Sequence, residues 1–328
     1  MFCWKADWGM SELPPVANQI SNVLLLLLFS TFIYALCLRF VSNTSAYDRI
    51  LLPIGDEERI VLNVDQSTET VSQLPICYEP DVYVSFVIVV ESFDQSTIGN
   101  LESVLRFANE RHLMNENFTF DIVVAMKSGI KDVGPLAEFA SRQANIHLLQ
   151  QLAIRGRGID TAIGVLYSRG GIVFTMDADS VGALGDFDKF EQRILHLREF
   201  KSDALVVGSR NIPNLYPNYI HSVLRMCGIK QITDVECPIK CYTREAARWL
   251  FTNQHFTGDH FEEELIQMAQ KRQMAIEELS VQTQYPTSKP KFLSSMQMAL
   301  NTLGGFAFHY LGIWSIQNKS FVPEMGEV

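Results

Sequence analysis

Two aspartates separated by one residue are the strongest chemical signal in this sequence. Asp177 and Asp179 follow Gly171–Met176, an apolar run typical of a buried strand. Two carboxylates at the end of such a strand repel each other unless a cation neutralises them, and oxygen ligands suit Mg²⁺ or Mn²⁺. A metal ion held by Asp177 and Asp179 would stabilise the diphosphate leaving group of a nucleotide sugar. A loop of solvated aspartates is the alternative.

A basic, glycine-containing loop lies shortly upstream of these aspartates. Arg155 and Arg157 alternate with Gly156 and Gly158 at the start of a helical pattern. Glycine lets the backbone approach a ligand closely, a helix N-terminus favours anions, and arginine binds phosphate through two hydrogen bonds. Alone, the loop resembles a basic surface turn. Next to the two aspartates, it predicts the other half of a diphosphate site.

Charged residues later in the sequence are further candidates. Arg210 follows the apolar run Ala204–Val207 and either faces a phosphate or caps the strand end. Lys240 is a candidate cation for an acceptor phosphate, with a solvated lysine as the alternative. The acidic run Glu262–Glu264 has helical spacing, and one of its glutamates could face the site, although a charged helix face is usually solvated.

The segments that would position these residues alternate between two types. Short apolar runs typical of strands are 82–90, 120–125, 146–149, 171–176 and 204–207. Helical spacing is found at 101–111, 136–143, 160–168 and 187–198. This alternation predicts an α/β fold with a mostly parallel sheet. Ligands of such sheets lie beyond the carboxyl ends of the strands.

Composition limits the possible function classes. The chain has 328 residues, of which 47% are hydrophobic and 20% charged, enough for one sizeable α/β domain with an appendage or two small domains. The net charge of -10 argues against broad nucleic-acid binding, which needs a basic surface.

An uncharged apolar segment near the N-terminus predicts a membrane anchor. Ile20–Leu38 contains five consecutive leucines and is followed by Arg39. About 19 residues at ~1.5 Å each span a bilayer core of about 30 Å. A cleaved signal peptide is the alternative, but the preceding region is long and carries Asp7 and Glu12. We therefore expect one transmembrane helix at 20–41.

Basic residues predict the orientation of this anchor. Arg39 and Arg49 follow the segment, which places residues 1–19 in the lumen and the body in the cytosol. Residues 42–80 would then be a connector, 81–290 the catalytic domain, and 291–328 an apolar C-terminal region forming an interfacial or core-packed helix pair. The N-glycosylation sequons at Asn43, Asn117 and Asn318 should be unmodified.

The order and spacing of these motifs resemble the dolichyl-phosphate β-glucosyltransferases, inverting family 2 glycosyltransferases with a GT-A fold. RGRG at 155–158 resembles the family's RGKGGA, and SRG at 168–170 with DAD at 177–179 resembles its SRG and LMADADG. GSR at 208–210 matches its GSR. The stretches 234–247 and 261–266 resemble its DTQCGFKLFTREAA and FDVELL, and TSK at 287–289 resembles its GSK.

The resemblance implies transfer of glucose from UDP-glucose to dolichyl phosphate at the cytosolic face of the endoplasmic reticulum membrane. The donor side would then include Arg155, Arg157, Asp177 and Asp94. Arg210 and Lys240 would face the acceptor phosphate. Asp179 and Glu262 would be catalytic, with Glu262 suggested as a general base by its position alone.

Departures from the family motifs open two hypotheses. The family's PSYNEE is Glu91–Gln95 here, and its VVDDGS is Val123–Ser128, which lacks both carboxylates of the uracil side. Its QCG is Glu236–Pro238, and its ERWAFD is Gly258–Glu262. One hypothesis is an active enzyme with a divergent donor pocket. The other is a catalytically silent, membrane-tethered binding or regulatory protein, and transfer of another sugar, such as mannose, is a third possibility.

Overall fold

The computed structural model describes residues 74–127, 130, 134–150, 156–282, 292–314 and 316. The chain divides into two units, Met1–Asn43 and Thr44–Val328, and all described residues belong to the second. The predicted anchor at 20–41, most of the connector at 42–80, Arg155 and the TSK motif at 287–289 lie outside them. Among the described residues, no helix is both long and apolar enough to cross a membrane.

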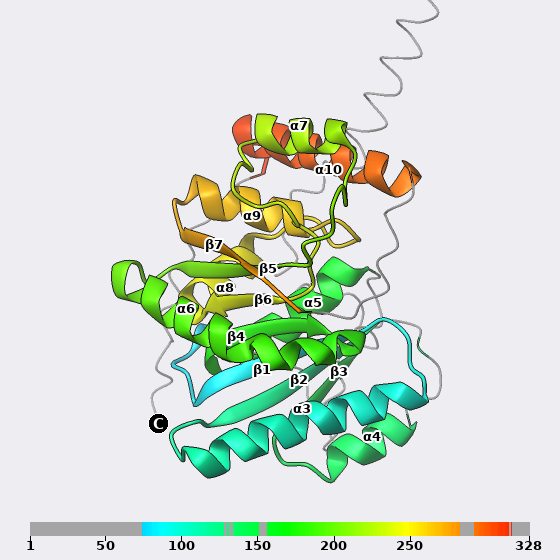
Figure 1. The fold of residues 1–328 in the computed structure, drawn as a ribbon, viewed down its shortest axis with the longest axis vertical. Helices are drawn as coiled ribbons and strands as arrows, with labels where there is room; N and C mark the ends of the chain where they lie inside the picture. The colour runs from blue at the N-terminus through cyan, green and yellow to red at the C-terminus, as the bar shows by residue number, and fades with distance from the viewer. Residues whose placement is uncertain are drawn as a thin grey trace, which may run out of the picture. The chain divides into compact units, whose positions relative to one another are not determined.

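Seven strands form one mixed sheet (Figure 1). The strands are β1 (Val82–Val90), β2 (Phe120–Met126), β3 (Ile146–Gln150), β4 (Gly170–Asp177), β5 (Ala204–Ser209), β6 (Lys240–Thr243) and β7 (Ala275–Ser280). Their order is β3-β2-β1-β4-β6-β5-β7, and only β6 runs antiparallel to its neighbours. This confirms the predicted α/β fold with its mostly parallel sheet.

Helices cover both faces of the sheet. They are η1 (Pro75–Cys77), α3 (Gln95–Met114), α4 (Gly134–Ser141), α5 (Arg157–Leu166), η2 (Ala178–Asp186), α6 (Phe187–Phe200), α7 (Asn218–Met226), α8 (Arg244–Asn253), α9 (Glu262–Lys271) and α10 (Phe292–Tyr310). Because side chains alternate along a strand, Phe86 of β1 joins a core with α3, α4 and α6, while Val87 joins one with α5, α8 and α9.

Two sequence expectations need correction. Strands β6 and β7 were not predicted, because β6 has four residues and begins with a lysine, and the polar AIEELS of β7 lacks strand alternation. Helix α3 begins earlier than expected, because Asp94 caps it. Of the C-terminal region 291–328, the described residues contain one helix, α10, which lies beside α7 above α9 (Figure 1), and the predicted helix pair stays a prediction.

Candidate active site

The carboxyl ends of β1 and β4 meet at an acidic cavity. The two strands are parallel neighbours, and Val89 pairs with Asp177. A cavity of about 250 Å³ lies beyond them and is lined by Val89, Glu91, Ser92, Asp94, Ser96, Thr97, Asn100, Asp177, Ala178 and Asp179. The structure therefore brings three predicted site residues, Asp94, Asp177 and Asp179, into one polar cavity.

The two aspartates of the motif differ in their surroundings. Asp177 is the last residue of β4, and both its carboxylate oxygens accept from Nη2 of Arg157, at 3.1 and 3.2 Å. Burial raises the pKa of Asp177, and Arg157 opposes this rise. Asp179 is exposed at the start of η2. A pair of oxygen donors, one partly buried and one exposed, fits a site for a hard divalent cation.

Arg157 is the centre of the charge cluster. Its half-buried guanidinium lies 2.6 Å from Glu262, 3.1 Å from Asp177 and 3.2 Å from Glu91. Burial lowers the pKa of Arg157, but the three carboxylates more than offset this and hold it well above its usual value. Lys240 and Lys127 add positive charge near Glu262 and Glu91, but the carboxylates at the cavity, with nearby Asp179, still outnumber the single guanidinium that bonds them. This excess of negative charge supports a cation-binding role for the cavity.

The glycine loop before α5 packs against the chain segment before α9. Gly156 has a φ of 143°, and a Cβ there would lie 2.3 Å from the carbonyl oxygen of Thr257. The amides of Gly158 and Ile159 donate to the carbonyls of Gly258 and Thr257, at 3.1 and 2.9 Å. These first-turn amides, which we expected to face a diphosphate, are therefore bonded within the protein. The donor role of Arg157 stays a prediction.

Asp94 has a structural role besides lining the cavity. It is the N-cap of α3, where its carboxylate accepts from the amide of Thr97 at 3.0 Å while Thr97 Oγ1 accepts from the amide of Asp94 at 3.1 Å. The hydrogen bonds from Ser96 and Thr97 lower the pKa of Asp94. The sequence analysis proposed a donor-side role and missed this cap, although S/T/D followed by a helical pattern is its usual signal.

The two proposed acceptor-phosphate residues are both bonded within the protein. Arg210 donates from Nε and Nη2 to Asp234, at 2.8 and 2.7 Å. Lys240 is only 3% exposed and donates to the carbonyl of Cys237, so the solvated alternative for this lysine is wrong. Its charge contributes to holding down the pKa of Glu262. Contact of either residue with a phosphate stays a prediction.

The three glutamates of α9 are all buried, contrary to the expectation for a charged helix face. Glu262 bonds Arg157. Glu263 lies near Glu236 and His260. Glu264 accepts from His255 Nδ1 at 3.0 Å and is bonded by His309 Nε2 of α10 at 3.2 Å. These side chains thus join α9 to three different parts of the chain, which the sequence could not show because the partners are distant.

The electrostatics of Glu262 and Glu264 follow from their partners. Burial raises the pKa of Glu262, but Arg157 and then Lys240 offset it, so the pKa lies below its usual value. Burial likewise opposes ionisation of Glu264, but His255 and His309 lower its pKa to about 2. Both carboxylates are therefore ionised at neutral pH.

Asp160 is a buried residue of this region that the sequence analysis missed. It is 2% exposed, and neither carboxylate oxygen has a hydrogen-bond partner among the described residues. Burial raises its pKa to about 7, helped by Glu91 and Asp259 and opposed by Lys127. Asp160 aligns with the final alanine of the family motif RGKGGA. An aspartate in place of an alanine is the sequence signal that would have identified this residue.

Replacing Asp160 with asparagine should remove a pH-dependent loss of stability. Because the folded pKa exceeds the ordinary value of 3.8, the native state binds more protons between about pH 4 and 7, and stability falls as pH rises through that window. The loss is at most about 4 kcal/mol. We expect Asp160→Asn to raise the unfolding midpoint at pH 8 and not at pH 4, measured by urea denaturation. Equal pH slopes for both proteins would contradict the assignment.

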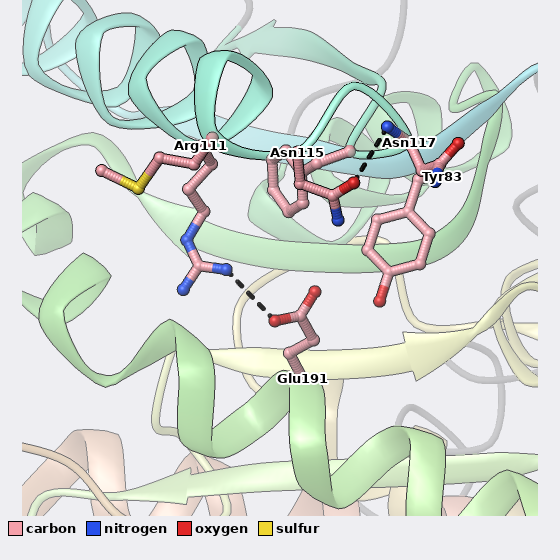
Figure 2. A pocket seen from close by; sticks show the side chains of 7 residues that line it. Tyr83, Arg111, Asn115, Asn117 and Glu191 are labelled. Carbon is pink, nitrogen blue, oxygen red and sulfur yellow. Dashed lines mark hydrogen bonds and ion pairs between the residues drawn. The ribbon is translucent and has the colours of Figure 1, made fainter.

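A second cavity lies at the opposite end of the sheet (Figure 2). It has a volume of about 430 Å³ and includes Tyr83, from the start of β1. Its Arg111 is paired with Glu191 at 3.2 Å, and Asn115 accepts from the amide of Asn117 at 3.1 Å (Figure 2). It contains no predicted site residue, and it lies away from the carboxyl ends of the strands, where ligands of such sheets bind.

Comparison with known proteins decides the family. No family model matches the chain. A dolichyl-phosphate beta-glucosyltransferase of Trichomonas vaginalis is 33% identical over 332 residues, covering 96% of this chain and 98% of the relative. The chain belongs to the dolichyl-phosphate beta-glucosyltransferase family. The human dolichyl-phosphate beta-glucosyltransferase is 25% identical over 84% of this chain and 90% of its own length.

A solved structure supports the fold of this dolichyl-phosphate beta-glucosyltransferase family member. Mannosyl-3-phosphoglycerate synthase from Rubrobacter xylanophilus aligns with a TM-score of 0.50 and 14% identity, covering 74% of this chain and 78% of that one. At this identity the likeness concerns the fold alone. The family resemblance inferred from the motifs is confirmed by the sequence relatives.

Proposed function

We propose that this chain transfers glucose from UDP-glucose to dolichyl phosphate, with inversion at the anomeric carbon and with Mg²⁺ or Mn²⁺ bound at Asp177 and Asp179. The observation that carries the proposal is the acidic cavity at the ends of β1 and β4, which holds both aspartates in a member of this family. The surplus of carboxylates around Arg157 suits a divalent cation.

The chemistry needs little proton transfer. An oxygen of the acceptor phosphate forms the new bond to the anomeric carbon, while the bond from that carbon to the diphosphate oxygen breaks and UDP leaves. Because the acceptor phosphate is already an anion, no strong general base is required. A bound divalent cation would supply positive charge to the leaving diphosphate. The protein then has to position two anionic substrates.

The residues of the site fit that task. Arg157 fixes Asp177 and Glu262 on one guanidinium, so it orients a proposed metal ligand and a proposed catalytic residue together. Ionised Glu262 would accept a hydrogen bond or stabilise positive charge developing on the sugar, rather than donate a proton. The buried Lys240 lies close enough to Glu262 to lower the pKa of that carboxyl. In this proposal Lys240 lies on the side of the site that binds the acceptor phosphate.

A membrane location on the cytosolic side of the endoplasmic reticulum belongs to the same proposal. Helices α7 and α10 lie side by side (Figure 1). Both expose large apolar side chains: Tyr219, Met226, Phe292, Leu293, Met296, Phe306 and Tyr310. Such a surface suits contact with the headgroup region of a bilayer. It would bring the site to a lipid-borne acceptor.

One assay tests this function. The full-length chain in detergent, with radiolabelled UDP-glucose, dolichyl phosphate and Mn²⁺, should produce chloroform-soluble label that EDTA abolishes. Label from GDP-mannose but not from UDP-glucose would overturn the sugar assignment. No label from any UDP- or GDP-sugar, together with no metal-dependent UDP binding by calorimetry, would favour the silent binding protein.

The sequon at Asn117 gives a prediction for topology. Asn117 is exposed at the rim of the second cavity (Figure 2), so an oligosaccharyltransferase would reach it in the lumen. With the body in the cytosol, we expect no shift in gel mobility after endoglycosidase treatment. The matched control replaces residues 1–41 with a cleavable signal sequence, which should direct the body to the lumen. Asn117 should then be glycosylated there. A glycan on the native chain would reverse the proposed orientation.

A further inference from the structure

Three titratable side chains converge beside Glu262 without contacting Arg157. Glu236 precedes β6, His260 precedes α9, and Glu263 lies in the first turn of α9. One ligand-type atom from each lies within 4.8 Å of the others, and Nδ1 of His260 is hydrogen-bonded to Oε1 of Glu236. An imidazole and two carboxylates are therefore gathered around a single point.

Glu263 is the unusual member of this cluster. It is 0% exposed, and neither of its carboxylate oxygens has a hydrogen-bond partner among the described residues. A buried carboxylate without a partner is costly unless a proton or a cation neutralises it. Its position thus suits a ligand for a cation that would take the place of that proton.

The surroundings hold the other two groups in place. His260 has a φ of 61°, a left-handed conformation that costs energy for a non-glycine residue and persists where the structure imposes it. Tyr216 Oη lies 3.4 Å from a carboxylate oxygen of Glu236, and Ser294 Oγ of α10 lies 3.3 Å from Nε2 of His260. Such outer contacts fix the orientation of metal ligands.

The cluster also coincides with departures from the family motifs. Glu236 stands at the glutamine of QCG, and Glu263 stands at the valine of FDVELL. Two carboxylates have thus been introduced at positions that are far apart in the sequence and adjacent in space. The side chains of His260 and Glu236 are 11% and 20% exposed, which leaves a route for a small ion.

We propose that Glu236, His260 and Glu263 form a second divalent-metal site, distinct from the one at Asp177 and Asp179. One imidazole nitrogen and two carboxylate oxygens suit a transition-metal ion such as Zn²⁺, whereas the all-oxygen set at the two aspartates suits Mg²⁺ or Mn²⁺. Binding would replace the hydrogen bond between His260 and Glu236 and release a proton. The site stands on its own geometry and does not depend on which sugar is transferred.

Metal binding to the full-length chain tests the proposal directly. The Asp179→Ala variant serves as background, so that the first site is disabled, and Zn²⁺ is titrated by calorimetry with Co²⁺ absorption as a second readout. We expect one Zn²⁺ per chain, and a loss of affinity of about 100-fold or more when Glu263→Gln or His260→Asn is added. Asparagine is chosen because it tolerates a positive φ.

Controls separate binding from folding and from surface histidines. His196→Gln removes an exposed histidine that lies 3.8 Å from Glu199, and it should leave Zn²⁺ affinity unchanged. Zn²⁺ should raise the melting temperature of the background protein but not that of its Glu263→Gln form. Absence of Zn²⁺ binding in the background protein would overturn the proposal, and so would a Zn²⁺ affinity in the Glu263→Gln and His260→Asn forms equal to that of the background. Neither outcome bears on the proposed glucose transfer.

Discussion

Replacing Asp179 with alanine is expected to lower the rate of glucose transfer about 1,000-fold or more. The change removes the accessible carboxylate of the pair that would hold the cation, and with it several kcal/mol of stabilisation of the leaving diphosphate. Each 1.36 kcal/mol corresponds to a factor of ten in rate. The measurement is chloroform-soluble label formed from UDP-glucose and dolichyl phosphate at saturating Mn²⁺.

The structure also predicts that this variant stays folded. Asp179 is exposed, so its truncation should leave the melting temperature within about 1–2 °C of the wild type, as surface changes usually cost under 0.5 kcal/mol. Glu102→Ala, which removes an exposed carboxylate on α3, is the matched control and should keep full activity. Label formed by Asp179→Ala as fast as by the wild type would contradict the metal assignment.

The fold was predictable where one strand and its flanking residues carry the information. The buried run of β1 and the strand before Asp177 are recognisable from their apolar character alone. The predicted bounds of these two strands therefore agree with the structure to within one residue. The parallel pairing of β1 and β4 places the two aspartates at the ligand-binding edge of the sheet. Strand β6 was not predictable in this way, since its antiparallel pairing with β4 and β5 depends on contacts that are distant in sequence.

The charge cluster was only partly predictable, because its interactions are non-local. Arg157 and Asp177 were each chosen for their motifs, but their hydrogen bond and the bond of Arg157 to Glu262 join three separate elements. The run Glu262–Glu264 reads as a solvated face by its composition. Burial of Glu262 and Glu264 is possible because Arg157 bonds the first and His255 and His309 bond the second, and because acidic residues in the first turn of a helix are stabilised by the helix dipole.

Replacing Arg157 with glutamine should destabilise the protein in a pH-dependent manner as well as inactivate it. The guanidinium contacts Glu91, Asp177 and Glu262, and its removal leaves these carboxylates clustered without the positive charge that bonds all three. Breaking one partner of a buried ion pair typically costs about 3–5 kcal/mol. We expect a loss of that size at pH 7.5 by urea denaturation, with activity falling below detection in the lipid-labelling assay.

The direction of the pH dependence follows from Glu262. In the wild type its folded pKa lies below the ordinary 4.5, so its stabilising contribution is present at neutral pH and lost as pH falls. Without Arg157, burial is less opposed and the folded pKa of Glu262 should rise, so the variant should lose stability as pH increases above about 4.5. The difference between the two proteins should therefore be small at pH 4.5 and large at pH 7.5.

Two further variants make the test specific to this cluster. Adding Glu262→Gln to Arg157→Gln should recover part of the lost stability at pH 7.5, because one uncompensated buried charge is removed, while activity stays absent. Arg193→Gln, which breaks a partly exposed ion pair with Glu277, should cost under about 1 kcal/mol at either pH. If Arg157→Gln were as mild as Arg193→Gln at pH 7.5, the carboxylates around the cavity would not depend on this arginine, and the charge excess that argues for a bound cation would have to be balanced by another group.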